Sequence, residues 1–329
     1  MALRNNEIYK NFGKGLDMDI LDKKKINSTE EGTIVSGYAC IQTYSLQPQK
    51  NGGQYISGQL QVKGQLPFKV WSDTKPNGAY MCLVNSPDEY KGNVVYIRGK
   101  VDKFGGVTSL IIDTVRAVNV TELGLSESDF FEEVYSIEQW WGMLTSTLKK
   151  HCSSKAYSLF DDLMMSVKDR FLVEFAASYH HDNCKSGLLA HTTKVVKMAS
   201  LIKMYPNITK RLSVDALFLA CALHDIGKVY EYSNGVVTNN GKMISHHTFG
   251  AMIIVSNVNK ITDMMGEKFY YQLLSVIEQH HGEYGERPRT ALAYIVHLLD
   301  SMEANLTSLD SLLSESNGEQ IQFNGMKLI

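Results

Sequence analysis

Nine of the ten histidines in this 329-residue chain lie between residues 180 and 297, interspersed with aspartates in short motifs. His191 stands in GLLAHT, His224 and Asp225 open HDIGK, and Asp300 stands in HLLDSME. Imidazole and carboxylate groups bind divalent transition metals, and the aspartate of an adjacent His-Asp pair can bridge two cations. Paired cations can activate water for attack on phosphorus. These residues therefore predict a metal-dependent hydrolase of phosphate esters.

Four further histidines form two adjacent pairs, His246–His247 and His280–His281. Ser245 before the first pair is a candidate helix N-cap, and Gly282 after the second is a natural helix stop. Neighbouring residues on an ideal helix point about 100° apart, so both members of the second pair reach one ion only where a helix ends.

Helices are expected to position these groups, because residues 121–309 have helical spacing of apolar residues. Ser213 would cap the apolar helix that ends at His224, and Thr290 would cap the helix that carries Asp300. Ligands that converge from several helices are typical of metal sites in helical bundles.

Residues 32–120 read instead as five short strands with alternating apolar residues and Gly, Asn and Pro between them. AYMCLV, between the third and fourth strands, is expected to be a short helix that caps an OB-fold barrel. The expected organisation is an N-terminal segment (1–31), an all-β OB-fold domain (32–120), an all-α domain (121–309) and a C-terminal tail (310–329).

Composition limits the class of protein further. Residues 32–120 hold nine Lys and Arg against five Asp and Glu, so the strand region is mildly basic within a chain of net charge -2. The five cysteines form no C-x-x-C motif, which favours reduced thiols in a cytoplasmic protein. No apolar stretch approaches the ~20 residues that span a bilayer, so we expect no membrane partner.

The segments GLLAHT, ALHDIGKVYEY and HLLDSM resemble the HD phosphohydrolase superfamily, an all-helical fold. HHDNCKSGLLAHT, the segment from HDIGK to ISHH, and IEQHHGEYGERP, preceded by an OB-like barrel that contains FKVW, resemble the YhaM-type 3′→5′ exoribonucleases more narrowly. This resemblance covers roughly residues 30–305 and includes the domain order.

The resemblance implies two divalent cations, with manganese favoured and iron, cobalt or nickel as alternatives. The implied ligands are His191, His224 and Asp300 for one cation, His246, His280 and His281 for the other, and Asp225 as a bridge. His246 is preferred over His247 because it precedes Gly250 in an H-x-x-x-G pattern. Lys228 is expected to bind the phosphate as a catalytic residue. His180 and His181 are expected to be structural or substrate-lining, and His297 to orient Asp300.

One departure from the family pattern follows Asp300, where the chain reads SMEAN in place of a second aspartate and a lysine. Glu303 is a candidate replacement for that aspartate, but Asn305 does not replace the positive charge. The departure leaves the expected metal ligands intact and affects a substrate contact.

An OB barrel binds single strands by stacking bases on aromatic rings beside a basic groove. The aromatic candidates for this role are Tyr55, Phe68, Trp71, Tyr96 and Phe104, and the basic candidates are Lys63, Lys69, Arg98, Lys100 and Lys103. Because side chains alternate along a strand, each aromatic residue could equally lie in the barrel core or on the nucleic-acid-binding surface.

Together these features predict a metal-dependent 3′→5′ exonuclease that releases 5′-mononucleotides from single-stranded RNA, with single-stranded DNA as an alternative substrate. Two rivals stay open: an HD-domain nucleotide or cyclic-dinucleotide phosphohydrolase, and a non-enzymatic nucleic-acid-binding protein. The sequence leaves homo-oligomer formation undecided.

Overall fold

The computed structural model of the protein describes residues 20–50, 52–104, 107–125, 127–130, 135–177, 184–282, 285–315 and 320–328. The chain divides into two compact units, Met1–Glu132 and Glu133–Ile329, each with its own hydrophobic core. The division follows Glu132, eleven residues after the change in sequence character at residue 121. Among the residues described, no helix is both long and apolar enough to cross a bilayer.

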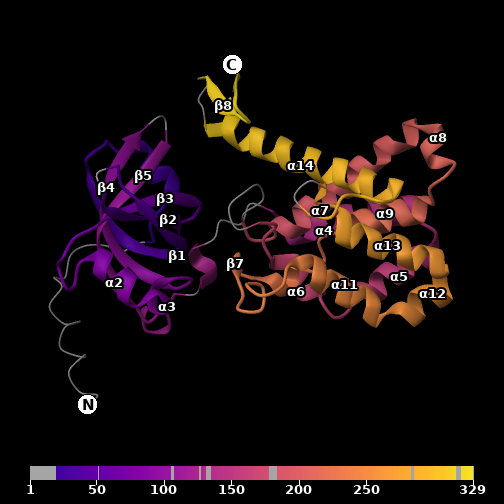
Figure 1. Ribbon diagram of the computed structural model, residues 1–329, viewed down its shortest axis with the longest axis horizontal. Coiled ribbons are helices and arrows are strands. Elements are labelled where there is room, and N and C mark those ends of the chain that lie inside the picture. The colour runs from indigo at the N-terminus through magenta and orange to yellow at the C-terminus, as the bar shows by residue number, and fades with distance from the viewer. Residues whose placement is uncertain are drawn as a thin grey trace, which may run out of the picture. The chain divides into compact units, whose positions relative to one another are not determined.

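The first unit contains a closed five-stranded barrel (Figure 1). Its strands are β1 (Ile34–Pro48), β2 (Gln54–Gln61), β3 (Gln65–Trp71), β4 (Val94–Phe104) and β5 (Val107–Ala117), in the spatial order β1-β2-β3-β5-β4. β3 pairs with β5 in parallel, and the other neighbours are antiparallel. α2 (Ala79–Asn85) and α3 (Pro87–Tyr90) connect β3 to β4, and α2 packs against β5. The expected OB-like barrel and its short helix are confirmed.

Strand alternation decides which side chains of β3 are available at the barrel surface. Leu66, Phe68 and Val70 are buried in the barrel interior, whereas Lys69 and Trp71 face outward. The side-chain period of a strand is two residues, so Phe68 and Trp71, three residues apart, cannot share a face.

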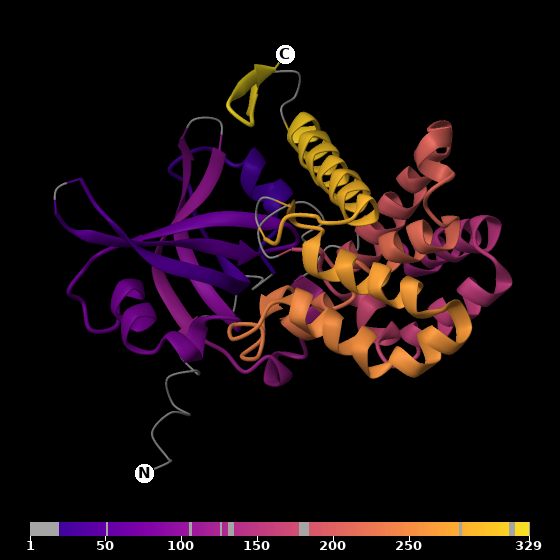
Figure 2. The ribbon, with the colours of Figure 1, turned by 45° about the vertical axis from the view of Figure 1, so that its right-hand side comes forward.

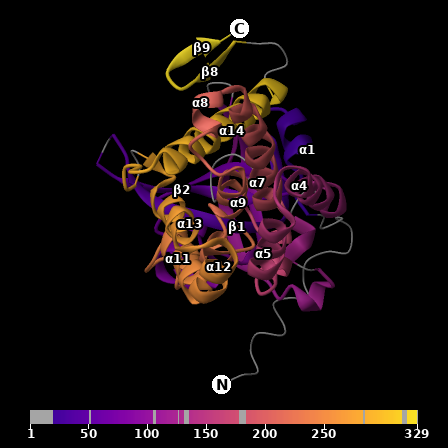
Figure 3. The ribbon, with the colours of Figure 1, turned by 90° about the vertical axis from the view of Figure 1, so that its right-hand side faces the viewer.

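The second unit is helical. Its helices are α4 (Ile137–His151), α5 (Ser154–Met164), α6 (Lys168–Val173), α7 (Gly187–Met198), α8 (Pro206–Thr209), α9 (Val214–Leu223), α10 (Lys228–Glu231), α11 (His246–Ser256), α12 (Val258–Met265), α13 (Glu267–Gln279) and α14 (Ala291–Glu315). The apolar helix α9 packs against α4, α7, α13 and α14 (Figure 3). Every residue from Ala216 to Leu223 is buried. The residues that directly follow this helix, His224 and Asp225, are therefore placed in the protein interior.

The ends of these helices largely follow the local sequence. The Ser213 hydroxyl accepts a hydrogen bond from the backbone of Ala216 at the start of α9, and Thr290 does the same for Ala293 of α14, as expected. Ser245 precedes α11 without a side-chain capping bond. α14 continues past residue 309 to Glu315 and is followed by a hairpin of β8 (Ile321–Phe323) and β9 (Met326–Leu328) (Figure 2).

Candidate metal centre

The first group of candidate ligands comes from three helices that pack together. His191 lies in α7, His224 and Asp225 directly follow α9, and Asp300 lies in α14. α7 contacts both α9 and α14, and α9 contacts α14. Four residues spread over 110 positions of sequence are therefore gathered by the packing of these helices.

The four side chains meet at distances suited to one cation. Nε2 of His191 lies 3.2 Å from Nε2 of His224, 3.4 Å from Oδ2 of Asp225 and 3.2 Å from Oδ1 of Asp300. Nε2 of His224 lies 3.3 Å from the same Asp225 oxygen and 3.8 Å from the same Asp300 oxygen. Donor atoms that each bind one cation at about 2.1 Å are roughly 3 to 3.5 Å apart.

A second group of donor atoms gathers where α11 begins and α13 ends. His246 is the first residue of α11, and His280 and His281 directly follow α13. The Nε2 atoms of His246 and His281 are 3.3 Å apart. Gly282 adopts a φ of 60°, which ends the helical path at the position expected from the sequence.

The carboxylate of Asp225 lies between the two groups. Its Oδ2 atom faces His191 and His224, while its Oδ1 atom lies 3.5 Å from Nε2 of His246 and 3.5 Å from Nε2 of His280. One buried carboxylate thus presents a separate oxygen to each cluster, which is the arrangement that a bridging ligand requires.

A backbone contact at Gly227 brings the second cluster close to Asp225. A Cβ atom at this position would lie 1.9 Å from the carbonyl oxygen of His246 and 2.5 Å from the backbone nitrogen of Gly250. Neither backbone atom can move away without shifting α11. The glycine of HDIGK therefore allows the start of α11, with His246, to pack against the chain that carries Asp225.

Four of the candidate ligand histidines use Nδ1 to contact protein acceptors. Nδ1 of His224 lies 2.8 Å from the Cys221 carbonyl, and Nδ1 of His246 lies 2.7 Å from a Glu231 carboxylate oxygen. Nδ1 of His280 lies 3.1 Å from the carbonyls of Val276 and Ile277. An Nδ1–H that donates to such an acceptor leaves the Nε2 lone pair available, as in metal-binding histidines generally.

Burial keeps the rings of His246, His247 and His281 in the neutral form that can bind metal. It lowers the pKa of His246 and His247 to about 3 and that of His281 to about 2, so all three rings are neutral near pH 7. A neutral ring can donate a lone pair to a cation, whereas a protonated ring cannot.

The carboxylates of the first cluster are ionised. Burial alone raises the pKa of Asp225, but the Lys228 ammonium and the neighbouring histidines hold it well below its usual range. Asp300 behaves in the same way: burial is outweighed by its hydrogen bond to His191 and by His224, so its pKa is also well below the usual range. Both groups can therefore bind a cation at neutral pH.

Several buried polar atoms at the centre have no hydrogen-bond partner in the described part of the chain. They are Oδ1 of Asp225 and the Nε2 atoms of His280 and His247. A buried polar atom left without a partner costs about 1 to 3 kcal/mol. Cations bound by the two clusters would remove this cost, so the donor set fits a divalent-metal centre.

Lys228 lies at the edge of the first cluster. Its buried ammonium Nζ is 2.7 Å from Oδ2 of Asp225, the oxygen that faces His191 and His224. The expected phosphate-binding role of this lysine stays a prediction.

Glu303 positions the ring of His191. The sequence indicates Glu303 only as a candidate replacement for the second aspartate of the family pattern. The fully buried carboxylate of Glu303 accepts a hydrogen bond from Nδ1 of His191, pairs with Nζ of Lys194 at 3.0 Å and accepts the Thr307 hydroxyl at 2.6 Å. Lys194, from α7, therefore places a positive charge beside Glu303. The sequence does not indicate Glu231, which orients the ring of His246.

The Glu303→Gln variant is expected to bind metal about 10- to 100-fold more weakly, because substitutions behind metal-binding histidines have effects of this size. The amide keeps the volume but loses the charge that pairs with Lys194 and orients His191. Calorimetric titration of the metal-free protein with Mn²⁺ measures the change. Asp310→Asn, which neutralises an exposed acid on the same helix, serves as the control. Equal affinities in the two variants would remove Glu303 from the centre.

His297 belongs to neither group of donor atoms. Nδ1 of His297 contacts the backbone carbonyl of His280 at 2.8 Å, and its ring lies where a side chain at Gly282 would be. It therefore supports the end of the α13 segment, whereas the sequence predicts that it orients Asp300. His180 and His181 lie outside the described residues.

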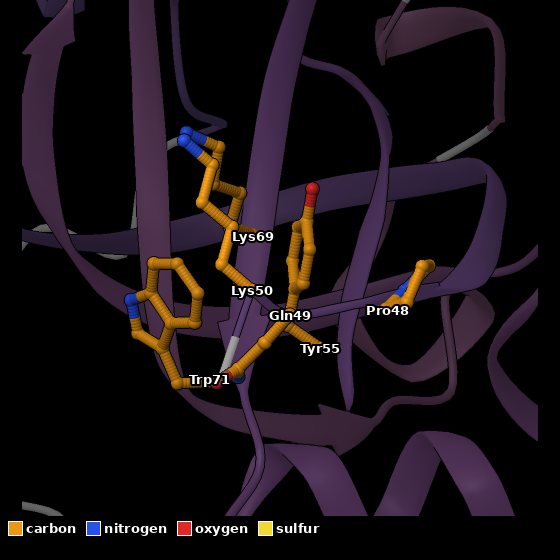
Figure 4. Close-up of a pocket in the computed structure, with 6 residues that line it drawn as sticks. All are labelled: Pro48, Gln49, Lys50, Tyr55, Lys69 and Trp71. Carbon is orange, nitrogen blue, oxygen red and sulfur yellow. The ribbon is translucent and has the colours of Figure 1, made fainter. Parts of the chain in front are cut away.

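The prediction that Phe68 binds nucleic acid is wrong. Its side chain is completely buried in the barrel core and cannot stack on a base. Trp71 is 46% exposed, and its ring lies 5.2 Å from that of Tyr55, its partner across β2 and β3. These two rings line an open hollow whose other walls are Pro48, Gln49, Lys50 and Lys69. Figure 4 shows Lys50 and Lys69 extending in the same direction beside the rings.

The basic candidates lie in different environments on the barrel surface. Lys69 and Lys100 both pair with Ile111 of β5, so they occupy one row across three strands. Arg98, on the same face of β4 as Lys100, forms an ion pair with Asp113 at 3.1 Å. Lys103 donates to the backbone carbonyl of Asn27 at 2.9 Å, which directs its ammonium toward the end of α1 (Lys23–Ser28).

Comparisons with known proteins cover both units. Residues 188–305 match the HD domain family. A curated 3'-5' exoribonuclease YhaM from Listeria monocytogenes is 28% identical over 310 residues, which is 89% of this chain and 92% of the relative. The YhaM of Listeria innocua is 27% identical with the same coverage.

A solved structure also aligns with part of the chain. The mitochondrial single-stranded DNA binding protein Rim1 from S. cerevisiae aligns with 27% of this chain and 98% of its own, at 13% identity and a TM-score of 0.23. The sequence matches confirm the resemblance expected from the motifs: the chain contains an HD domain at residues 188–305 and is similar over nearly nine-tenths of its length to YhaM exoribonucleases.

Proposed function

We propose that this protein is a metal-dependent 3′→5′ exonuclease that hydrolyses single-stranded RNA and releases 5′-mononucleotides. The observation that carries the proposal is the position of Asp225, whose two carboxylate oxygens each face a separate cluster of ligand atoms. The HD domain match and the similarity to YhaM exoribonucleases support the same reaction.

The proposed centre holds two divalent cations. His191, His224 and Asp300 would hold one, His246, His280 and His281 the other, and Asp225 would contact both. Bound there, the cations would activate water and neutralise charge that develops on the phosphate. Imidazole-rich sites favour manganese, iron, cobalt or nickel over magnesium, and we propose manganese as the physiological ion.

Side chains around the proposed centre orient the metal-binding rings and provide a positive charge for the phosphate. Glu303 and Glu231 fix the rings of His191 and His246. Lys228 would hold a non-bridging phosphate oxygen as a point charge at the edge of the centre. The buried surroundings strengthen these electrostatic interactions relative to water.

The barrel would hold the strand from which nucleotides are removed. The Tyr55–Trp71 pair offers an aromatic surface for a base, and the neighbouring Lys69 and Lys100 offer charge for phosphates. Because these contacts neutralise phosphates, RNA affinity should fall steeply as salt concentration rises.

The test is incubation of the purified protein with 5′-labelled single-stranded RNA and DNA across a panel of divalent metals. A ladder that shortens from the 3′ end, with faster loss of RNA, supports the proposal. Cleavage of nucleotides or cyclic dinucleotides with no loss of RNA would assign the centre to a small-molecule phosphohydrolase. Binding of RNA without hydrolysis under any metal would make the protein a binding module.

Trp71→Ala is expected to weaken binding of single-stranded RNA about 5- to 150-fold, since one base–aromatic stack contributes about 1 to 3 kcal/mol. Fluorescence anisotropy with labelled RNA in the presence of a chelator measures affinity without degradation. Tyr205→Ala, which removes a similarly exposed ring from the helical unit, is the matched control. Unchanged affinity in Trp71→Ala would show that the hollow on the barrel does not hold RNA.

A further inference from the structure

The ring of His247 lies inside the second cluster beside the three histidines already assigned to it. Its centroid is 4.4 Å from that of His246, 4.8 Å from that of His280 and 4.5 Å from that of His281. The ring of His246 itself is farther from those of His280 and His281, at 5.8 and 4.9 Å. His247 is therefore at least as central to this cluster as the histidine that the sequence pattern favours.

His247 also offers a donor atom in the right place. One ring nitrogen from each of the four histidines can be chosen so that all four lie within 4.8 Å of one another. The Nε2 atom of His247 is buried, and no described residue gives it a hydrogen bond. A surface or packing histidine would have a protein or water partner for that atom.

The sequence presents His246 and His247 as alternatives, but the structure does not require a choice between them. His246 is fixed by Glu231 through Nδ1 and directs Nε2 toward His281. The ring of His247 approaches the same cluster nearly perpendicular to that of His246, at an interplanar angle of 78°. Both rings can therefore serve one cation from different directions.

We infer that His247 is a fourth histidine ligand of the second cation, which makes this site selective for transition metals over Mg²⁺. The inference rests on the proposed two-cation centre. The two sites then differ in chemistry. The first has two imidazoles and two carboxylate oxygens, whereas the second has four imidazoles and one oxygen of Asp225.

This difference in donors predicts a difference in metal preference. Carboxylate oxygens bind Mg²⁺ well, while imidazoles favour transition-metal ions such as Mn²⁺, Fe²⁺, Co²⁺ and Ni²⁺ over Mg²⁺. Affinity at the four-histidine site should rise along the series Mn²⁺, Fe²⁺, Co²⁺, Ni²⁺. Millimolar Mg²⁺ should leave that site without a cation.

Titration of the metal-free full-length protein with Co²⁺ tests the inference, with calorimetry for affinity and visible absorption for the ligands of bound Co²⁺. The wild type should bind two Co²⁺ ions. His247→Gln should weaken one of the two steps about 10- to 100-fold, leave the other unchanged and alter the absorption spectrum of the affected ion. His151→Gln, the same change in a histidine stacked on Phe218 away from the centre, should match the wild type.

The outcomes separate the inference from the function on which it rests. Two Co²⁺ ions in wild type, with affinities and spectrum unchanged in His247→Gln, would overturn the inference and leave the two-cation centre standing. Weaker binding without a spectral change would overturn it as well, because His247 would then only support its neighbours. A single Co²⁺ ion in the wild type would overturn the two-cation centre itself.

Discussion

The Asp225→Asn variant is expected to lose at least about 10³-fold in the rate of RNA hydrolysis. Removing a single electrostatic contact to the reacting group commonly costs 10² to 10³, and this carboxylate faces both ligand clusters. The asparagine keeps the size of the side chain but provides only one neutral oxygen. Turnover of 5′-labelled RNA at saturating Mn²⁺ measures the loss.

Two further measurements make this result specific. RNA affinity should stay close to that of the wild type, because the proposed strand-binding residues lie in the barrel. Circular dichroism should show the same helix content, although the loss of the partner of Lys228 lowers the melting temperature. Asp263→Asn, at an exposed acid on α12, controls for charge. Full activity of Asp225→Asn with unchanged metal content would exclude this centre from the reaction.

Replacing His246 or His281 by alanine is expected to lower the metal content from about two ions per chain to about one. Each substitution removes an Nε2 donor from the second cluster, while the four donors around His191 stay in place. Activity should fall at least about 10²-fold, because one of the two cations that stabilise charge is lost.

Elemental analysis after dialysis against a fixed low concentration of free Mn²⁺ measures the content directly. His224→Ala provides the matched variant on the other side of Asp225 and should also retain about one ion. If the wild type binds one ion tightly and the His246 and His281 variants keep it, the chemistry belongs to the four-ligand site alone.

The architecture and the main ligand candidates could be predicted from the sequence because each depends on local pattern. Five alternating segments indicated the barrel, and the apolar run before His224 indicated a buried helix that carries it inward. Gly282 indicated that a helix ends at His280 and His281, where both rings can face one site.

The sequence could not supply the partners that hold these ligands. Lys194 and Glu303 are more than a hundred residues apart, and only the packing of α7 against α14 brings them together. Glu231 lies on a short helix whose direction depends on the backbone contact at Gly227. Such pairings depend on tertiary structure, and no local motif encodes them.

The burial of Phe68, by contrast, follows from the local sequence of β3. Leu66, Phe68 and Val70 form one apolar face of β3, and Lys69 and Trp71 form the other. The period of two along β3 therefore places Phe68 and Trp71 on opposite faces, and only Trp71 is available at the barrel surface.

The ion pairs within the centre affect whether the chain can fold before it binds metal. Lys228 balances Asp225, and Lys194 balances Glu303, so these buried carboxylates have a counter-charge from the chain itself. An unpaired buried carboxylate would cost several kcal/mol. Small zinc domains, by contrast, stay unfolded until metal binds. We therefore expect the chain to fold before it binds metal. A chain made when metal is scarce would then be inactive but folded, and a later supply of metal would activate it without new synthesis.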